Sequence, residues 1–203
     1  MSTLLSLTQG VDAVVLGASA GGVEVLSALF PKLPRECSLS FMVVMHMPRE
    51  RPSLLPEVFA TRCGLPVREA EDKERVQPGT VYLAAPDYHL LIDQGPSLAL
   101  SSDAPVHFSR PSIDVLFESA ADVYRERLMG IILTGANRDG ASGLAAVGRA
   151  GGRTVVQEPG SAAAPFLPEA ALQEGPVDAV LSLAELQELF SYMGPVMLRR
   201  PLE

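Results

Sequence analysis

Three polar residues each follow a short apolar stretch of the sequence, and their types suit nucleophilic chemistry: Ser19, His46 and Asp139. A serine hydroxyl is a weak nucleophile until a neutral histidine takes its proton. A carboxylate must in turn orient that histidine and stabilise the imidazolium that forms. Hydroxyl, imidazole and carboxylate together therefore predict acyl transfer through a covalent serine intermediate.

Ser19 lies in the segment Gly17-Ala-Ser-Ala-Gly21, which fits the G-x-S-x-G pattern of a strand-to-helix turn that exposes a serine. A helix that begins at Gly21 would direct its N–H groups and its positive dipole end at the same point, where an oxyanion would form. The pattern alone also suits a phosphate-binding turn. A dinucleotide fingerprint would need a glycine in place of Ser19, and the lysine of a P-loop is missing.

His46 and Asp139 each have a structural alternative as well. A single histidine at the end of a buried strand is often a satisfied core residue, and an aspartate just before a helix is a natural N-cap. Ligand sites of open α/β sheets, however, gather beyond the carboxyl ends of the strands. Because all three residues follow expected strands, their coincidence favours a catalytic triad.

Short apolar stretches alternate with helical patterns along the chain, which predicts an α/β fold: a doubly wound, mainly parallel sheet with helices on both faces and an inserted antiparallel β-hairpin. The expected strands are 11–16, 39–45, 65–70, 80–84, 129–134, 154–157 and 178–181, and the hairpin pairs 89–93 with 97–101. The expected helices begin near 22, 54, 112, 141, 168 and 184, and Ser112 is the expected N-cap of the third. We expect a single domain over residues 1–203, with a core at about 10–190.

Composition limits the function further. The net charge of −8 over 203 residues argues against a uniform basic surface for duplex DNA or anionic lipid. Cys37 and Cys63 are too few for a disulfide framework, and no apolar stretch approaches the ~18 residues of a membrane span. The N-terminus also lacks the basic region of a signal peptide, so we expect a cytoplasmic protein.

The remaining histidines and arginines are weaker candidates. His46, His89 and His107 have neither metal-ligand spacing nor a cysteine partner, so no metal ion and no cofactor are expected. His89 at a hairpin start and Arg110 before a helix would suit substrate contact. A hydrogen-bonded structural role for His89 and a surface ion pair for Arg110 remain open.

Five motifs in order give the sequence a resemblance to a known family. They are Gly17-Ala-Ser-Ala-Gly-Gly22, Met45-His-Met-Pro48, Val81-Tyr-Leu-Ala-Ala-Pro86 with His89, Arg110-Pro-Ser-Ile-Asp-Val-Leu-Phe117 and Leu133-Thr-Gly-Ala-Asn-Arg-Asp-Gly140. Over about residues 10–190 the chain resembles the catalytic domain of the chemotaxis protein-glutamate methylesterases, the CheB family.

The resemblance implies that Ser19 is the nucleophile, His46 the general base and then acid, and Asp139 the orienting carboxylate. It implies backbone oxyanion donors at Ala20 and Ala136. The implied reaction is hydrolysis of glutamate γ-methyl esters on methyl-accepting chemotaxis receptors with release of methanol, with deamidation of receptor glutamines as a second activity.

The sequence also departs from the family pattern. Ala20 stands where a threonine is common, and Ala136-Asn137 replaces the common Met-Gly. Two alternatives therefore stay open: a catalytically silent binding module of the same fold, and a methylesterase of a non-chemotaxis pathway. About ten residues precede the first expected strand, so we expect no attached receiver domain and consider a regulatory partner in trans.

Receptor methylation helices are acidic, so docking would need local positive charge on a chain of net charge −8. Arg49, Arg51, Arg110 and Arg138 lie close in sequence to the segments that form the expected site. They are the candidates for receptor docking, with a purely solvating role as the alternative.

Overall fold

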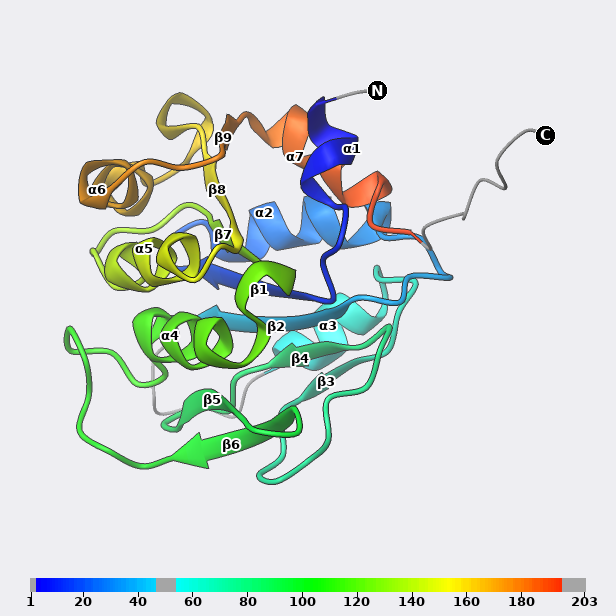
Figure 1. Cartoon of the computed structure of the whole chain (residues 1–203), viewed down its shortest axis with the longest axis vertical. Helices are drawn as coiled ribbons and strands as arrows, with labels where there is room; N and C mark the ends of the chain where they lie inside the picture. The colour runs from blue at the N-terminus through cyan, green and yellow to red at the C-terminus, as the bar shows by residue number, and fades with distance from the viewer. Residues whose placement is uncertain (1–2, 47–53, 195–203) are drawn as a thin grey trace.

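A seven-stranded parallel sheet forms the centre of the computed structural model, which describes residues 3–46 and 54–194 (Figure 1). The strand order is β3-β4-β2-β1-β7-β8-β9. The strands are β1 (Ala13–Ala18), β2 (Ser40–Met45), β3 (Val67–Glu69), β4 (Val81–Leu83), β7 (Leu128–Ile132), β8 (Arg153–Gln157) and β9 (Ala179–Leu181). Every residue of β1, β2 and β7 is buried, as expected for central strands covered on both faces.

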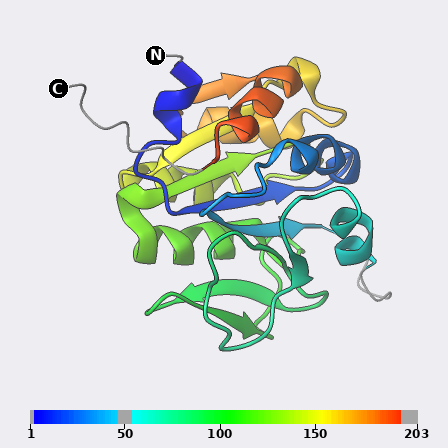
Figure 2. The same ribbon diagram turned by 90° about the vertical axis from the view of Figure 1, so that its right-hand side faces the viewer.

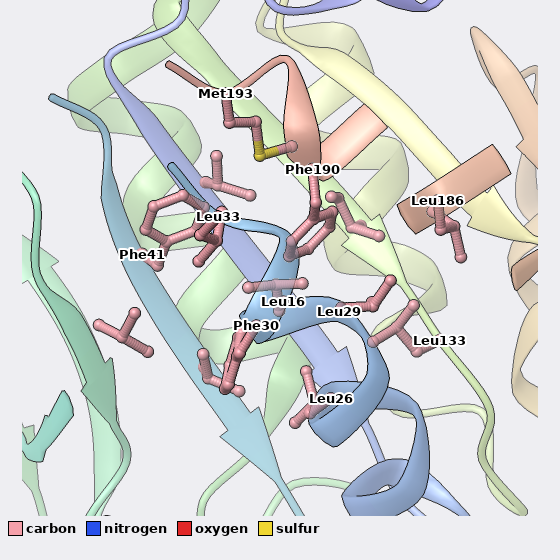
Figure 3. Close-up of a cluster of buried hydrophobic side chains, with 14 of the residues drawn as sticks. Leu16, Leu26, Leu29, Phe30, Leu33, Phe41, Leu133, Leu186, Phe190 and Met193 are labelled. Carbon is pink, nitrogen blue, oxygen red and sulfur yellow. The ribbon is translucent and has the colours of Figure 1, made fainter. Parts of the chain in front are cut away.

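Helices cover both faces of this sheet. One face carries α1 (Thr3–Leu7), α2 (Gly22–Leu29), α3 (Leu55–Ala60) and α7 (Leu183–Ser191), and the other carries α4 (Ile113–Tyr124), α5 (Ala141–Arg149) and α6 (Phe166–Glu174) (Figure 1). Each face has its own apolar core. In the first, Leu16 and Phe41 of the sheet lie with Leu26 and Phe190 of the helices (Figure 3). Burying one such side chain stabilises the fold by about 1.5–3 kcal/mol.

A hairpin of β5 (His89–Asp93) and β6 (Ser97–Ser101) lies beside α4 and forms a sheet of its own, separate from the main sheet (Figure 2). Its antiparallel register pairs His89 with Ser101. The backbone N–H of Ile92 donates to Ser119 Oγ on α4 at 3.1 Å, which fixes the hairpin against that helix.

The predicted fold class is confirmed, and the two hairpin strands have the predicted bounds. The other predicted strands and helices are present with shifts of a few residues at their ends. Helix α1 was not predicted, because five residues with one buried side chain, Leu7, carry no readable periodicity. None of the helices within 3–46 and 54–194 combines the length and the apolarity needed to cross a bilayer.

The centre of the sheet contains a topological switch point. β1 lies between β2 and β7, and the chain leaves β1 for α2 on one face but leaves β7 for α5 on the opposite face. The segments that follow β1 and β7 therefore lead to helices on opposite faces of the sheet. This is where open α/β sheets bind their ligands.

Candidate active site

Ser19 and His46 follow the ends of two paired strands at this switch point. The last residues of β1 and β2, Ala18 and Met45, are register partners, and the backbone N–H of His46 donates to Ala18 O at 3.0 Å. Asp139 reaches the same edge from the loop after β7, on the other side of β1. The predicted convergence of the three residues thus follows from the strand order.

The turn that carries Ser19 is fixed by the loop after β7. The Ser19 N–H donates to Thr134 O at 2.9 Å, and Thr134 Oγ1 donates to Ala20 O at 2.8 Å. A Cβ atom on Gly135 would lie 2.7 Å from Leu167 Cδ2 and 3.1 Å from Ser19 Cβ, so only glycine fits there. The Ser19 hydroxyl itself has no hydrogen-bond partner in the described part of the chain.

The Asp139 carboxylate is fully buried at the N-terminus of α4 and accepts four hydrogen bonds. Its Oδ1 accepts from Ser112 Oγ at 2.7 Å and from the Asp114 N–H at 3.1 Å. Its Oδ2 accepts from the Ile113 N–H at 2.8 Å and contacts His46 Nε2 at 2.7 Å. A helix N-terminus and a hydroxyl thus hold this carboxylate on one side while it faces the imidazole on the other.

Burial raises the pKa of Asp139, but the hydrogen bonds from His46, Ser112 and the Ile113 N–H outweigh burial and bring that pKa below its ordinary value. Asp139 is therefore an ionised acceptor at neutral pH.

The N-cap interpretation of Asp139 needs a correction. Its side chain caps α4 rather than the helix that follows it, since the N-cap residue of α5 is Gly140, which has no side-chain cap. The predicted N-cap role of Ser112 on α4 is confirmed by its acceptance of the Val115 N–H at 3.4 Å.

The orientation of His46 leaves one ring nitrogen for proton transfer. Because the ionised Asp139 only accepts, Nε2 carries the hydrogen of the neutral ring and Nδ1 carries the lone pair. Asn137 Nδ2 lies 3.3 Å from Nδ1. The Asn137 Oδ1 accepts the Asp139 N–H at 3.3 Å, which directs the amide nitrogen toward His46. Sequence reasoning did not assign Asn137 a role, although it marked the position as a departure from the family pattern.

The two residues expected to supply oxyanion donors follow β1 and β7. Ala20 follows Ser19 just before α2, and Ala136 lies in the loop after β7; both residues are exposed. Within residues 3–46 and 54–194 neither N–H donates to a protein acceptor. That these N–H groups serve as oxyanion donors stays a prediction from the resemblance.

The predicted substrate contacts differ in their surroundings. His89 is 1% exposed: Nε2 lies 3.2 Å from Ala104 O, and Nδ1 accepts the Ser112 N–H at 3.2 Å. The His89 ring thus has almost no surface for a substrate and orients the residue that binds Asp139. This favours the structural alternative for His89.

The Arg110 guanidinium bonds Asp87 Oδ1 at 2.8 Å, Ser102 O at 2.7 Å and Asp103 O at 3.0 Å. Arg110 therefore holds the segment that precedes α4 against Asp87. Arg138 contacts Glu174 Oε2 at 3.1 Å, and its side chain is 56% exposed, so it offers the more accessible positive charge. Arg49 and Arg51 lie outside the described residues.

Comparisons with known proteins show the family of this chain. The CheB methylesterase family profile matches residues 14–190. A putative protein-glutamate methylesterase/protein-glutamine glutaminase of Leptospira interrogans is 42% identical over 179 residues, covering 88% of this chain and 93% of that protein. A protein-glutamate methylesterase/protein-glutamine glutaminase of Bordetella parapertussis is 38% identical over 86% of this chain, which spans 51% of the length of that relative.

The fold comparison is equally direct. The crystal structure of the Thermotoga maritima CheB methylesterase catalytic domain superposes with a TM-score of 0.84 at 32% identity, covering 89% of this chain and 97% of that one. The resemblance of the five motifs is thereby confirmed: the chain belongs to the CheB methylesterase family.

Proposed function

We propose that this chain hydrolyses glutamate γ-methyl esters on chemotaxis receptors, with Ser19 as nucleophile, His46 as general base and Asp139 as orienting carboxylate. The observation that carries this proposal is the pair of His46 and buried Asp139, 2.7 Å apart, beside the strand end that holds Ser19. Family membership supports the ester as substrate, because the relatives in Leptospira and Bordetella are named as protein-glutamate methylesterases.

In the first half of the reaction Ser19 Oγ attacks the ester carbonyl carbon while His46 Nδ1 takes the hydroxyl proton. Asp139 stabilises the resulting imidazolium through Nε2. The carbonyl oxygen becomes an oxyanion at the N–H groups of Ala20 and Ala136. When the intermediate collapses, the C–O bond to the methoxy group breaks, and Nδ1 returns its proton to release methanol.

In the second half a water molecule attacks the acyl-enzyme and gives its proton to His46 Nδ1. Collapse then breaks the bond to Ser19 Oγ, which regains its proton, and the glutamate carboxyl is released. The same steps with ammonia as the leaving group would deamidate a glutamine, in line with the second activity in the names of the relatives.

A serine-reactive fluorophosphonate tests whether this site is active and so excludes the silent-module alternative. We expect a single covalent label on Ser19, located by peptide mass spectrometry, because only a serine beside a general base is nucleophilic enough. His46→Ala is expected to slow labelling strongly, whereas Ser27→Ala on α2 leaves it unchanged. A label elsewhere, or none on folded protein, would overturn the proposed triad.

Loss of the Asn137 side chain is expected to speed up acylation, whereas loss of His46 slows the reaction of Ser19. Its Nδ2 donates toward the lone pair of His46 Nδ1 that must accept the Ser19 proton, and it also donates to Ser109 Oγ at 3.4 Å. We expect Asn137→Ala to raise the pre-steady-state rate of acylation by a small activated ester about two- to tenfold, since a neutral hydrogen bond of about 1 kcal/mol no longer has to break. Stopped-flow measurement of the burst decides this, and a slower burst would contradict it.

A further inference from the structure

The structure contains a second histidine–carboxylate pair, His107 with Asp114, next to the pair of His46 and Asp139. His107 Nε2 is 3.5 Å from Asp114 Oδ2, as His46 Nε2 is 2.7 Å from Asp139 Oδ2. The two carboxylates belong to helices that cap each other: Asp139, just before α5, binds N–H groups of α4, whereas Asp114 in the first turn of α4 binds N–H groups of α5. The proposed mechanism does not use Asp114 or His107.

Hydrogen bonds link Asp114 and Asp139 in both directions, and together they form a closed ring of contacts. Asp114 is 4% exposed, and its Oδ1 accepts the N–H of Gly140 at 2.9 Å and that of Gly143 at 2.6 Å. Its own N–H donates to Asp139 Oδ1 at 3.1 Å. Because Gly140 is the residue after Asp139, one carboxylate fixes the backbone that carries the other.

The packing around Asp114 leaves little freedom for this ring. A Cβ atom on Gly143 would lie 2.9 Å from Asp114 Cα and 2.7 Å from Phe117 Cβ, so α4 and α5 are in close contact here. Any shift of the Asp114 side chain would be transmitted to Gly140 and so to Asp139.

The carboxylate form is unfavourable at this place. Burial first, and then the charge of Asp139, raise the pKa of Asp114 to about 6 against the lowering effect of the Gly143 and Gly140 N–H groups. The exposed Glu118 on the same helix also raises this pKa, and His107 faces the second oxygen. A raised pKa means that the folded state binds the proton more tightly, so the contribution of Asp114 to stability is lost as the pH rises through about 6.

We propose that Asp114 is a positioning residue for the triad: by accepting the Gly140 and Gly143 N–H groups, it fixes the direction in which Asp139 presents its carboxylate to His46. This inference rests on the proposed function of Ser19, His46 and Asp139. It assigns the effect to the acceptor oxygen Oδ1, which an asparagine also supplies.

The test compares Asp114→Ala with Asp114→Asn, and uses Glu118→Ala on the same helix as the matched control. Turnover of a small activated ester is measured per active serine, counted by fluorophosphonate titration, so loss of folded protein does not enter kcat. We expect Asp114→Ala to lower kcat about 10²-fold with little change in KM, because misplacement of a catalytic group by about 1 Å costs that much. Asp114→Asn and Glu118→Ala should stay within about threefold of the parent chain.

Two results would overturn the proposal: a normal kcat per active serine in Asp114→Ala, or an equal loss in the asparagine and alanine variants. If Asp114→Ala yields no folded protein, Asp114→Glu displaces the same oxygen by one methylene and should lower kcat in the same way; a normal kcat there also contradicts the role. Failure of the proposed function has a different signature, since the parent chain itself would then show neither labelling of Ser19 nor ester turnover.

Discussion

Asp139→Ala is expected to lower kcat for ester hydrolysis by about 10³-fold or more and to destabilise the fold. The substitution removes the acceptor of the Ser112 hydroxyl and of the Ile113 and Asp114 N–H groups, all in a fully buried place. Each buried group left without a partner costs about 1–3 kcal/mol. A lower midpoint of chemical unfolding should therefore accompany the loss of activity.

Asp139→Asn separates these two effects. One amide oxygen can still accept from Ser112 and the Asp114 N–H, so the asparagine variant should be more stable than the alanine variant. Its NH₂ group, however, would face His46 Nε2 as a donor, which forces the ring into the tautomer with hydrogen on Nδ1. With no lone pair left for the Ser19 proton, we expect a rate loss close to that of alanine.

The control for both variants is Asp178→Ala. Asp178 Oδ2 also accepts two hydrogen bonds, from the N–H and Oγ1 of Thr154, but at the start of β8, away from the switch point. This variant should lose stability without losing kcat per active serine. Asp139→Asn with activity within tenfold of the parent chain would remove Asp139 from the triad.

Ser19→Ala and His46→Ala are each expected to lower the hydrolysis rate by about 10³-fold or more, and the double variant should be no slower than either single one. The reason is that nucleophile and base act in one step: once either is missing, the other has nothing to transfer or accept. Ser19→Ala is expected to leave folding nearly unchanged, because Ser19 Oγ has no partner in the described part of the chain. His46→Ala removes a hydrogen bond to the buried Asp139 carboxylate, so it should also lower the midpoint of unfolding.

Whether Ser19 and His46 act in one step is tested by measuring the hydrolysis rates of the two single variants and the double variant. One activated ester is used under saturating conditions. Losses that multiply would show that Ser19 and His46 act independently, contrary to a triad. Ser27→Ala in the last turn of α2 serves as the control for the serine substitution.

The fold was predictable because its signals are local. Apolar stretches of four to seven residues separated by helical patterns indicate parallel strands, and Gln94-Gly95-Pro96 marks the hairpin turn. The rule that ligand sites follow the carboxyl ends of strands selected Ser19, His46 and Asp139, and the order β2-β1-β7 brings those strand ends together.

The partners of Asp139 were not predictable from the sequence. An aspartate before a helix is expected to cap that helix. Only because α4 and α5 pack together does Asp139 accept an N–H of α4, while Asp114 accepts the N–H of Gly140 at the start of α5. The contact of Asn137 with His46 and the burial of His89 depend on tertiary packing in the same way. None of these contacts leaves a periodic pattern in the sequence.

The most direct test of the central claim is methanol release from a methylated chemotaxis receptor by this chain and by its Ser19→Ala variant. We expect methanol, measured by gas chromatography, to appear with the parent chain and to fall at least 10³-fold with the variant, as the receptor glutamates lose their methyl groups. Equal release by both proteins would contradict Ser19 as the nucleophile. No release by a chain whose Ser19 reacts with a fluorophosphonate would contradict the receptor methyl ester as its substrate.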